Sequence, residues 1–241
     1  MPRFYCDQPL AIGAIFDLPA ALAHHVQVLR LAPGALVTLF NGSGGEFTAT
    51  VNVIERRQVR VEVKAFSARE AELPYAITLA QALPEASKMD WIVEKAVELG
   101  VTALQPLASQ RCVVRLSGER AAKRLLHWQA IAIAAAEQSG RNRIMHVPAT
   151  VDFESYVQQQ DLHLRILLSP TAETSLSHWA RHQPPQSVTL MVGPEGGFSA
   201  AEQSRTVPHG ILALSMGPRI LRTETAGLAA LAALNAIWGE M

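Results

Sequence analysis

Two loops near the C-terminal end hold the residues best suited to bind a ligand. The first reads GPEGGF at residues 193–198 and follows the apolar run 188–192. Gly196 and Gly197 allow a close approach that a Cβ would block, and Ser199 with Glu202 fits a helix capping box. Glu195 would repel an anion, and the spacing is not that of a phosphate-binding loop. A rigid ligand pocket and a tight strand-to-helix turn without any ligand both remain open.

The second loop, at residues 214–226, reads LSMGPRILRTETA and joins an apolar pair to a charged, hydroxyl-bearing cluster. Ile220 and Leu221 could wall an apolar pocket in which backbone groups read the edge of a base. Arg222, Thr223 and Glu224 would then stand at its mouth. The same residues also fit an ordinary helix start, with Thr223 as N-cap and Glu224 in the first turn. Both interpretations can hold together.

The elements that must position these loops follow Pro74, where strands alternate with helices. Strands are predicted at residues 76–83, 103–107, 164–168, 188–192 and 211–215, and helices at 87–99, 117–139 and 226–238. Ser87 with Asp90 fits a capping box at the start of the first helix. This rhythm favours a largely parallel sheet covered on both faces, whose ligands bind beyond the carboxyl ends of the strands. The two loops therefore predict one shared site.

The first 70 residues have a different pattern. Short strands are predicted at residues 10–16, 35–40, 46–54 and 58–64, with one helix over residues 20–31. This pattern is typical of a small β-barrel or sandwich. The polar stretch 67–74 then marks a boundary, which divides the chain into domains at residues 1–70 and 71–241.

Composition excludes several classes of protein. Cys6 and Cys112 stand alone, so neither a disulfide framework nor a zinc site is expected, and no metal is predicted. The apolar runs are too short for a membrane span, and the N-terminus lacks the regions of a secretory signal, so we expect an intracellular protein. Lys plus Arg and Asp plus Glu both number 21, so net charge does not indicate a nucleic-acid partner. Residues 111–143 nevertheless carry seven basic against two acidic side chains, which fits either phosphate contact or a solvated helix face.

The two loops, together with the segments KMDWIVEKAVELGV, SQRCVVRL and AAAEQSGRNR, resemble the RsmE family of bacterial 16S ribosomal RNA uridine-N3 methyltransferases. The resemblance spans nearly the whole chain, because MPRFY, HHVQVLRL and FNGSGGEF are similar to that family's N-terminal domain. It implies an α/β fold: a SPOUT-type parallel-sheet methyltransferase domain with a C-terminal trefoil knot, preceded by a small PUA-like β-barrel that binds RNA. It also implies a cytoplasmic homodimer that acts on 16S rRNA in the small ribosomal subunit.

The resemblance implies S-adenosyl-L-methionine as cofactor. Its binding site is expected to draw on three loops, at Leu168, Ser169, Pro170, Gly193, Pro194, Glu195, Gly196, Gly197, Leu214, Met216, Gly217, Ile220, Leu221 and Thr223. Methylation of a pyrimidine N3 requires removal of the imide proton and shelter for negative charge on the base. Arg222, beside the cofactor loops, is predicted to stabilise the uracil anion, and Glu224 is a weaker candidate for accepting the proton.

A target base must leave its stack to react, so basic side chains have to hold the surrounding RNA. The candidates are arginines in both predicted domains: Arg3, Arg30, Arg111, Arg115, Arg141 and Arg143.

Three alternatives compete with this interpretation. A SPOUT enzyme could act on transfer RNA or on a 2′-hydroxyl, where no imide proton has to be removed. A non-catalytic RNA-binding module could keep the barrel, although erosion of the C-terminal loops would then be expected. A nucleotide-binding oxidoreductase is disfavoured because no Rossmann glycine fingerprint is present.

Overall fold

The computed structural model describes residues 1–56 and 58–239, and its contacts divide the chain into two compact units. Unit 1 comprises Met1–Glu72 and Ala136–Ile144, and unit 2 comprises Leu73–Ala135 and Met145–Met241. The change of unit after Glu72 falls in the polar stretch 67–74. Residues 136–144, in contrast, belong to unit 1, although the sequence pattern places them in the second domain.

Unit 1 contains a five-stranded sheet of order β1-β3-β4-β5-β2. β1 pairs with β3 in parallel, and the other pairs are antiparallel. Alternate residues of β3 to β5 point into a core that they share with α1. The elements are β1 Arg3–Tyr5, β2 Ile15–Asp17, α1 Ala20–Val28, β3 Leu36–Phe40, β4 Glu46–Ile54 and β5 Val59–Ser67.

The first predicted strand, at residues 10–16, was placed wrongly in part. Ile12 and Gly13 form a turn instead, where Gly13 has a φ of +85° and the apolar Ile12 is 64% exposed. Ile15–Asp17 forms the strand that pairs with β5, and the Gly13 N–H and the Ala14 carbonyl also hydrogen-bond to Val63 of β5. The three-residue β1 was not predicted. A strand this short carries too few residues for an alternating pattern to be recognised.

Residues 136–144 are tied to unit 1 by polar contacts. The Arg3 guanidinium donates to Asn142 Oδ1 at 2.6 Å, and Asn142 Nδ2 donates to the Arg69 carbonyl at 2.6 Å. The Tyr5 N–H donates to Glu137 at 2.8 Å. Because these partners are far apart in sequence, no local pattern could assign the segment to this unit.

Unit 2 contains a six-stranded sheet of order β11-β9-β10-β6-β7-β8, in which every pair is parallel. β10 is buried along its whole length, as a central strand covered on both faces should be. The predicted ranges for β9 and β10 match the structure to the residue. The strands are β6 Ile77–Ala82, β7 Ala103–Ala108, β8 Val151–Asp152, β9 Leu164–Leu168, β10 Val188–Val192 and β11 Leu212–Leu214.

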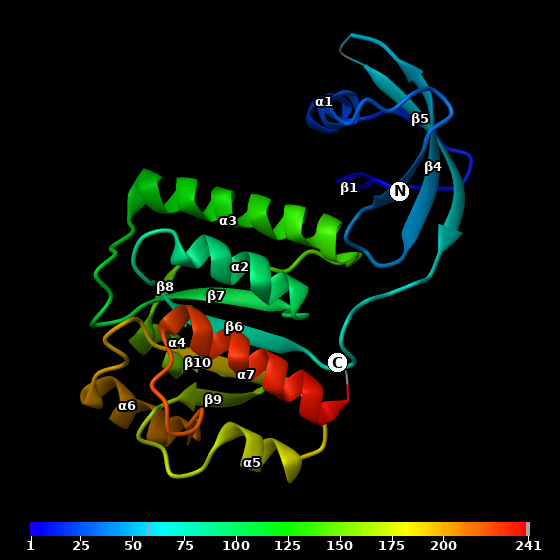
Figure 1. Cartoon of the computed structure of the whole chain (residues 1–241). Helices are drawn as coiled ribbons and strands as arrows, with labels where there is room; N and C mark the ends of the chain where they lie inside the picture. Colours follow the sequence, from blue (N-terminus) through cyan, green and yellow to red (C-terminus); the bar gives the residue numbers. More distant parts are fainter. Residues whose placement is uncertain (57, 240–241) are drawn as a thin grey trace. The chain divides into compact units, whose positions relative to one another are not determined.

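Helices flank this sheet. In Figure 1 the C-terminal helix α7 (red) lies between α2 and α5, and it contacts both of them as well as β10. Leu228, Leu231 and Leu234 form part of its buried face. The helices are α2 Lys88–Glu98, α3 Gly118–Ser139, α4 Phe153–Gln158, α5 Leu176–Arg181, α6 Ala200–Thr206 and α7 Thr223–Trp238, and a 3-10 helix covers Val207–His209.

The predicted helix caps give mixed results. The capping box of Ser199 and Glu202 is confirmed, with both hydrogen bonds in place. Ser87 makes no side-chain cap, so that prediction was wrong. The Asp90 carboxylate instead accepts from Trp128 Nε1 and contacts His127 Nε2, both at 3.0 Å, so it ties α2 to α3.

No helix within residues 1–56 and 58–239 is long and apolar enough to cross a membrane. Cys6 and Cys112 are both buried and free.

Candidate functional site

The loops that follow β9, β10 and β11 enclose a cavity of about 510 Å³. It lies beyond the carboxyl ends of parallel strands, where ligands of such sheets bind. All the predicted cofactor residues except Leu214 line it. Leu214 is the last residue of β11 and is buried, and its carbonyl accepts a hydrogen bond from the Ser169 N–H at 2.9 Å. Its role is therefore to place the 169–171 loop beside the cavity.

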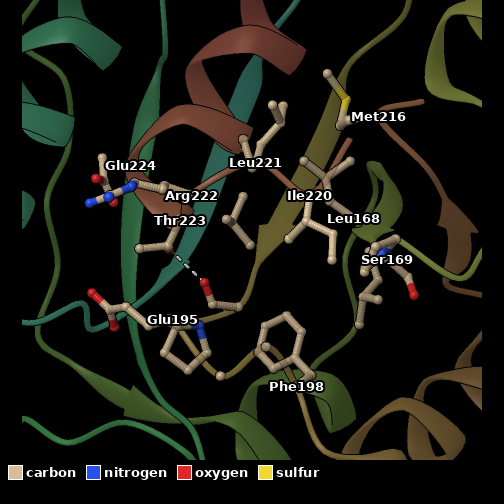
Figure 2. A pocket seen from close by; sticks show the side chains of 18 of the residues that line it. Leu168, Ser169, Glu195, Phe198, Met216, Ile220, Leu221, Arg222, Thr223 and Glu224 are labelled. Carbon is tan, nitrogen blue, oxygen red and sulfur yellow. Dashed lines mark hydrogen bonds between the residues drawn. The ribbon is translucent and has the colours of Figure 1, made fainter. Parts of the chain in front are cut away.

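The walls of the cavity are mainly apolar. Figure 2 shows Leu168, Phe198, Met216 and Leu221 around it. Phe198 is 4% exposed and packs against Phe153, which fixes its ring. An apolar interior with a few fixed polar groups is the usual form of a site for a flat heterocyclic ligand.

Ile220 departs from the expected enclosed wall. It lines the cavity but is 86% exposed, so it forms a rim and not an interior surface. Leu221, in contrast, is half-buried. The cavity is therefore open to solvent beside Ile220.

The 193–198 loop depends on glycine for two reasons. A Cβ on Gly193 would come within 2.9 Å of the Phe198 backbone nitrogen and 3.0 Å of the Gly197 Cα, so the loop closes on itself only with glycine there. Gly197 has a φ of +65°, a conformation that glycine adopts without strain. The ensuing capping box fixes the start of α6. The loop is therefore rigid before any ligand arrives.

A hydroxyl pair marks the β9 side of the cavity. Ser169 Oγ lies 3.0 Å from Thr171 Oγ1 and donates to Gln203 Oε1 at 3.2 Å. Gln203 in turn donates to the Phe198 carbonyl at 3.0 Å. Gln203 thus joins the 169–171 loop to the 193–198 loop. Sequence reasoning missed it because it lies on α6, outside both loops.

The sequence suggested Thr223 as the N-cap of α7, but Thr223 does not occupy that position. The N-cap position belongs to Arg222, and it makes no side-chain cap. Thr223 Oγ1 instead donates to the Gly193 carbonyl at 2.6 Å and accepts from Gln81 Nε2 at 2.9 Å. Gln81 is fully buried in β6, and Thr223 is 5% exposed. The hydroxyl therefore connects β6, the 193–198 loop and the start of α7.

Removing that hydroxyl should weaken cofactor binding. Thr223→Val keeps the shape but leaves the Gly193 carbonyl without this donor and removes one of the two acceptors of Gln81 Nε2, at about 1–3 kcal/mol for each lost hydrogen bond. We expect affinity for S-adenosylmethionine to fall about tenfold and the thermal midpoint to drop, as measured by titration and scanning calorimetry. The matched variant Thr223→Ser keeps the hydroxyl and should retain most of the affinity. Equal affinity in the Val variant and the unmodified chain would contradict this role.

Charged side chains line one side of the cavity. Lys88 Nζ donates to Glu195 Oε1 at 2.6 Å and lies 3.8 Å from Glu224 Oε2. The Glu85 N–H also donates to Glu195 Oε1, at 3.0 Å. Burial alone would raise the pKa of Glu195, but the hydrogen bond from Lys88, the backbone hydrogen bonds at Glu85 and Glu195, and the Lys88 charge together hold the pKa below its ordinary value. The hydrogen bond to Glu195 raises the pKa of Lys88, so Lys88 and Glu195 are both ionised at neutral pH.

Both predicted catalytic residues line the cavity. Arg222 is exposed, and Glu224 is half-buried in the first turn of α7. Three further cations line it: Lys88, Arg111 and Arg219. Sequence reasoning missed Lys88, although it lies within a segment that carried the resemblance. No spacing links it to Glu195, which is 107 residues away.

The candidate RNA-binding arginines fall into two groups. Arg30, Arg111, Arg115 and Arg143 are exposed. Arg111 also donates to the Gly196 carbonyl at 2.7 Å, and Arg115 donates to the carbonyls of Ser109 and Gln110. Arg3 is largely covered and engaged with Glu46.

Arg141 was a wrong candidate for phosphate contact. It is 3% exposed, and its guanidinium binds the Glu72 carboxylate through both Nε and Nη2. A guanidinium already bound to a carboxylate in the interior cannot reach RNA. The sequence could not reveal this, because the buried Arg141 and the exposed Arg143 stand in the same basic run.

No cluster of metal-ligating side chains occurs among the residues that the structure describes.

Comparison with known families gives two matches. A model of the RNA methyltransferase domain matches residues 71–235, and a model of an RNA methyltransferase PUA domain matches residues 18–64. Ribosomal RNA small subunit methyltransferase E of Bacillus subtilis is 31% identical, with 98% of this chain and 96% of that protein covered.

Solved structures give the same result. A ribosomal RNA small subunit methyltransferase E from Neisseria gonorrhoeae, bound to S-adenosylmethionine, is 39% identical with a TM-score of 0.92, covering 99% of this chain and 98% of that one. A methyltransferase from Legionella pneumophila in complex with the same cofactor is 38% identical with a TM-score of 0.91, covering 97% and 96%. The fold class implied by the resemblance is thereby confirmed.

Proposed function

This chain belongs to the family of the ribosomal RNA small subunit methyltransferase E proteins, and on that premise we propose that it methylates N3 of a specific uridine in 16S rRNA, using S-adenosylmethionine. One observation carries the proposal most directly. The cavity at the strand ends is apolar and rigid where a cofactor would lie, and charged and open at its rim where a base would enter.

The cavity fits the cofactor in size and chemistry. Its volume and apolar walls suit an adenosyl group, with backbone groups of the three loops reading the base edge. We propose that the residues predicted for the cofactor hold it, with Leu214, Thr223 and Glu195 acting through the loops that they fix. When bound, S-adenosylmethionine supplies an electrophilic methyl group on a sulfonium.

We propose that Arg222 and Glu224 serve the methyl acceptor. Arg222 is exposed at the rim, so it can approach a base oxygen and offset the negative charge that develops when N3 loses its proton. The Glu224 carboxylate can accept that proton. Ile220, which also lines the cavity, is exposed, so the cavity is open to solvent at this point.

Methylation of purified small subunits that lack the modification, followed by mass spectrometric mapping of digested rRNA, tests the proposal. A methyl group on N3 of one uridine is the expected result. A methyl group on a 2′-hydroxyl, or activity on transfer RNA alone, would place the chain in a different branch of methyltransferases. Calorimetry should detect binding of S-adenosylmethionine and none of NAD.

We also propose that residues 1–70 form an RNA-binding PUA-like domain and that residues 71–241 form a methyltransferase domain. The family matches at residues 18–64 and 71–235 support this division. We propose in addition that the protein acts as a homodimer in the cytoplasm, where its ribosomal substrate is found. Sedimentation velocity would then give twice the mass of one chain.

RNA contact by Arg143 can be separated from a structural effect by comparison with Arg141. The Arg143 side chain is 54% exposed and lies 4.0 Å from Glu70, so it remains available for phosphate. Arg143→Ala should reduce the slope of log affinity against log salt by about 0.7–0.9, the loss of one phosphate contact, without changing the thermal midpoint. Arg141→Ala should instead lower the midpoint, because Glu72 loses its buried partner. An unchanged salt slope in the Arg143 variant would exclude that contact.

A further inference from the structure

Lys88 is the cation at the charged side of the cavity to which no role has been assigned. It stands at the first position of α2 and lines the cavity together with Glu195 and Glu224. Figure 2 shows the side chains of Glu195 and Glu224 on the same side of the cavity. One lysine thus contacts two carboxylates, one from the 193–198 loop and one from the first turn of α7.

Glu224 Oε2 lies in an unusual position. This oxygen is buried, yet it has no hydrogen-bond partner among the described residues. Lys88 Nζ, at 3.8 Å, is too far away to donate a hydrogen bond. Leaving a buried carboxylate oxygen without a donor costs free energy, and a catalytic role is one of the reasons for which native structures keep such a group. The oxygen is therefore placed to accept a hydrogen bond from a ligand.

Lys88 retains donors of its own. An ammonium has three N–H groups, and one of them is directed at Glu195. Glu195 is itself held by the Glu85 N–H, so the lysine is anchored to a fixed carboxylate. The cavity therefore presents a donor on Lys88 beside an acceptor on Glu224, with 3.8 Å between the two atoms.

We propose that Lys88 and Glu224 together recognise the imide edge of the target uracil, with Lys88 donating to a base carbonyl oxygen and Glu224 accepting from N3–H. An imide offers a carbonyl oxygen directly beside an N–H, which complements this donor and acceptor. A cytosine offers no N–H at N3 and is not complementary. This inference rests on the proposed function and adds to it a substrate-contacting residue and a basis for base selection.

Lys88 and Glu224 also provide a route for the proton that leaves N3 of the base. The N3–H proton passes to the Glu224 carboxylate, and the N3 electron pair forms the new bond to the methyl carbon. The bond from that carbon to sulfur breaks, and its electrons remain on sulfur. Lys88 holds the negative charge that spreads onto the base carbonyl as N3 loses its proton, and its raised pKa keeps it charged for this purpose.

The amino acid end of the cofactor is the competing ligand for the same pair. It too carries a donor and an acceptor, an ammonium and a carboxylate. In that case Lys88 and Glu224 would contribute to cofactor affinity and not to the reaction of the base. A measurement that separates cofactor binding from turnover distinguishes the two.

The test compares Lys88→Met with the matched control Lys95→Met. Lys95 lies on the same helix, also pairs with two carboxylates, and is similarly exposed, but it does not line the cavity. We expect Lys88→Met to lower kcat on small subunits about 10- to 100-fold, a larger factor than any loss of affinity for S-adenosylmethionine that follows from the release of Glu195. Lys88→Arg should recover part of the rate, and Lys95→Met should keep both quantities. Weaker cofactor affinity at normal kcat would overturn the proposal in favour of the cofactor.

Thio-substituted substrates locate the contact on the base. Small subunits reconstituted with 4-thiouridine or 2-thiouridine at the target position carry a poorer hydrogen-bond acceptor at one of the two base carbonyls. For the analogue whose sulfur replaces the oxygen bound by Lys88, the loss of kcat from thio substitution and the loss from Lys88→Met should not multiply. Both changes remove the same hydrogen bond. If the losses multiply for both analogues, Lys88 does not touch the base. The proposed function is tested separately, with the unmodified enzyme and ordinary subunits. If only the inference about Lys88 is wrong, this enzyme still methylates uridine N3.

Discussion

Arg222→Ala should abolish methylation while it leaves binding of S-adenosylmethionine largely intact. Arg222 is exposed at the rim of the cavity, and Thr223, not Arg222, holds the adjoining cofactor loop. Its side chain can therefore be removed without disturbing the walls. Losing a fixed donor to a developing negative charge costs about 10²–10³-fold in kcat. Single-turnover rates on small subunits, together with calorimetric titration of the cofactor, measure the two effects separately.

Arg219→Ala is the matched control for this experiment. Arg219 carries the same charge, lines the same cavity and lies three residues earlier on the same exposed segment. If both variants lose kcat equally, the general positive potential of the rim matters and not a specific contact of Arg222. Normal turnover in Arg222→Ala would remove this residue from the mechanism. Lys88 is present in both variants, so a difference in kcat between them reports on Arg222 and Arg219 alone.

The loops of the site were predictable because each is contiguous in sequence. The 193–198 loop carries its glycines and its capping box within ten residues, and β9 and β10 were predicted to the residue. A parallel sheet then brings the carboxyl ends of its strands together without further information. Local sequence therefore located the cavity, although the family resemblance was needed to identify the cofactor.

The connections across the site were not predictable. Gln81 reaches Thr223 over 142 residues and Lys88 reaches Glu195 over 107, and nothing in the local pattern of either segment indicates its partner. Thr223 was interpreted as an N-cap because a threonine before an acidic residue is typical of one. Its hydroxyl was instead used for a contact with another loop. Local propensity gave way here to a tertiary hydrogen bond.

The basic run between residues 111 and 143 shows the same limit for RNA contacts. Its members look alike in sequence, yet Arg141 is buried against Glu72 and Arg143 is exposed. The short elements β1, β8, α4 and α5 were missed for a related reason. Each is at most six residues long, too short for a helical or alternating period to stand out.

Gly193→Ala should weaken binding of S-adenosylmethionine about 10- to 100-fold. The added Cβ would lie 2.9 Å from the Phe198 nitrogen and 3.0 Å from Gly197, and all these contacts are to backbone that cannot rotate away. The loop must therefore open, at a cost of about 1–3 kcal/mol that is borne by the cofactor-binding conformation. Opening also breaks the 2.6 Å hydrogen bond from Thr223 to the Gly193 carbonyl, so the loop loses its attachment to α7.

Gly210→Ala separates this effect from general destabilisation. Gly210 lies in the same unit, has a φ of +66° and has open space where a Cβ would stand, and it does not line the cavity. Alanine there introduces backbone strain of about 1–2 kcal/mol and should lower the thermal midpoint without changing cofactor affinity. Gly193→Ala should lose more affinity for S-adenosylmethionine than Gly210→Ala does at a similar decrease in thermal midpoint. Equal affinities in the two variants would mean that the 193–198 loop tolerates opening, and that the cavity holds its ligand mainly through the β9 and β11 loops.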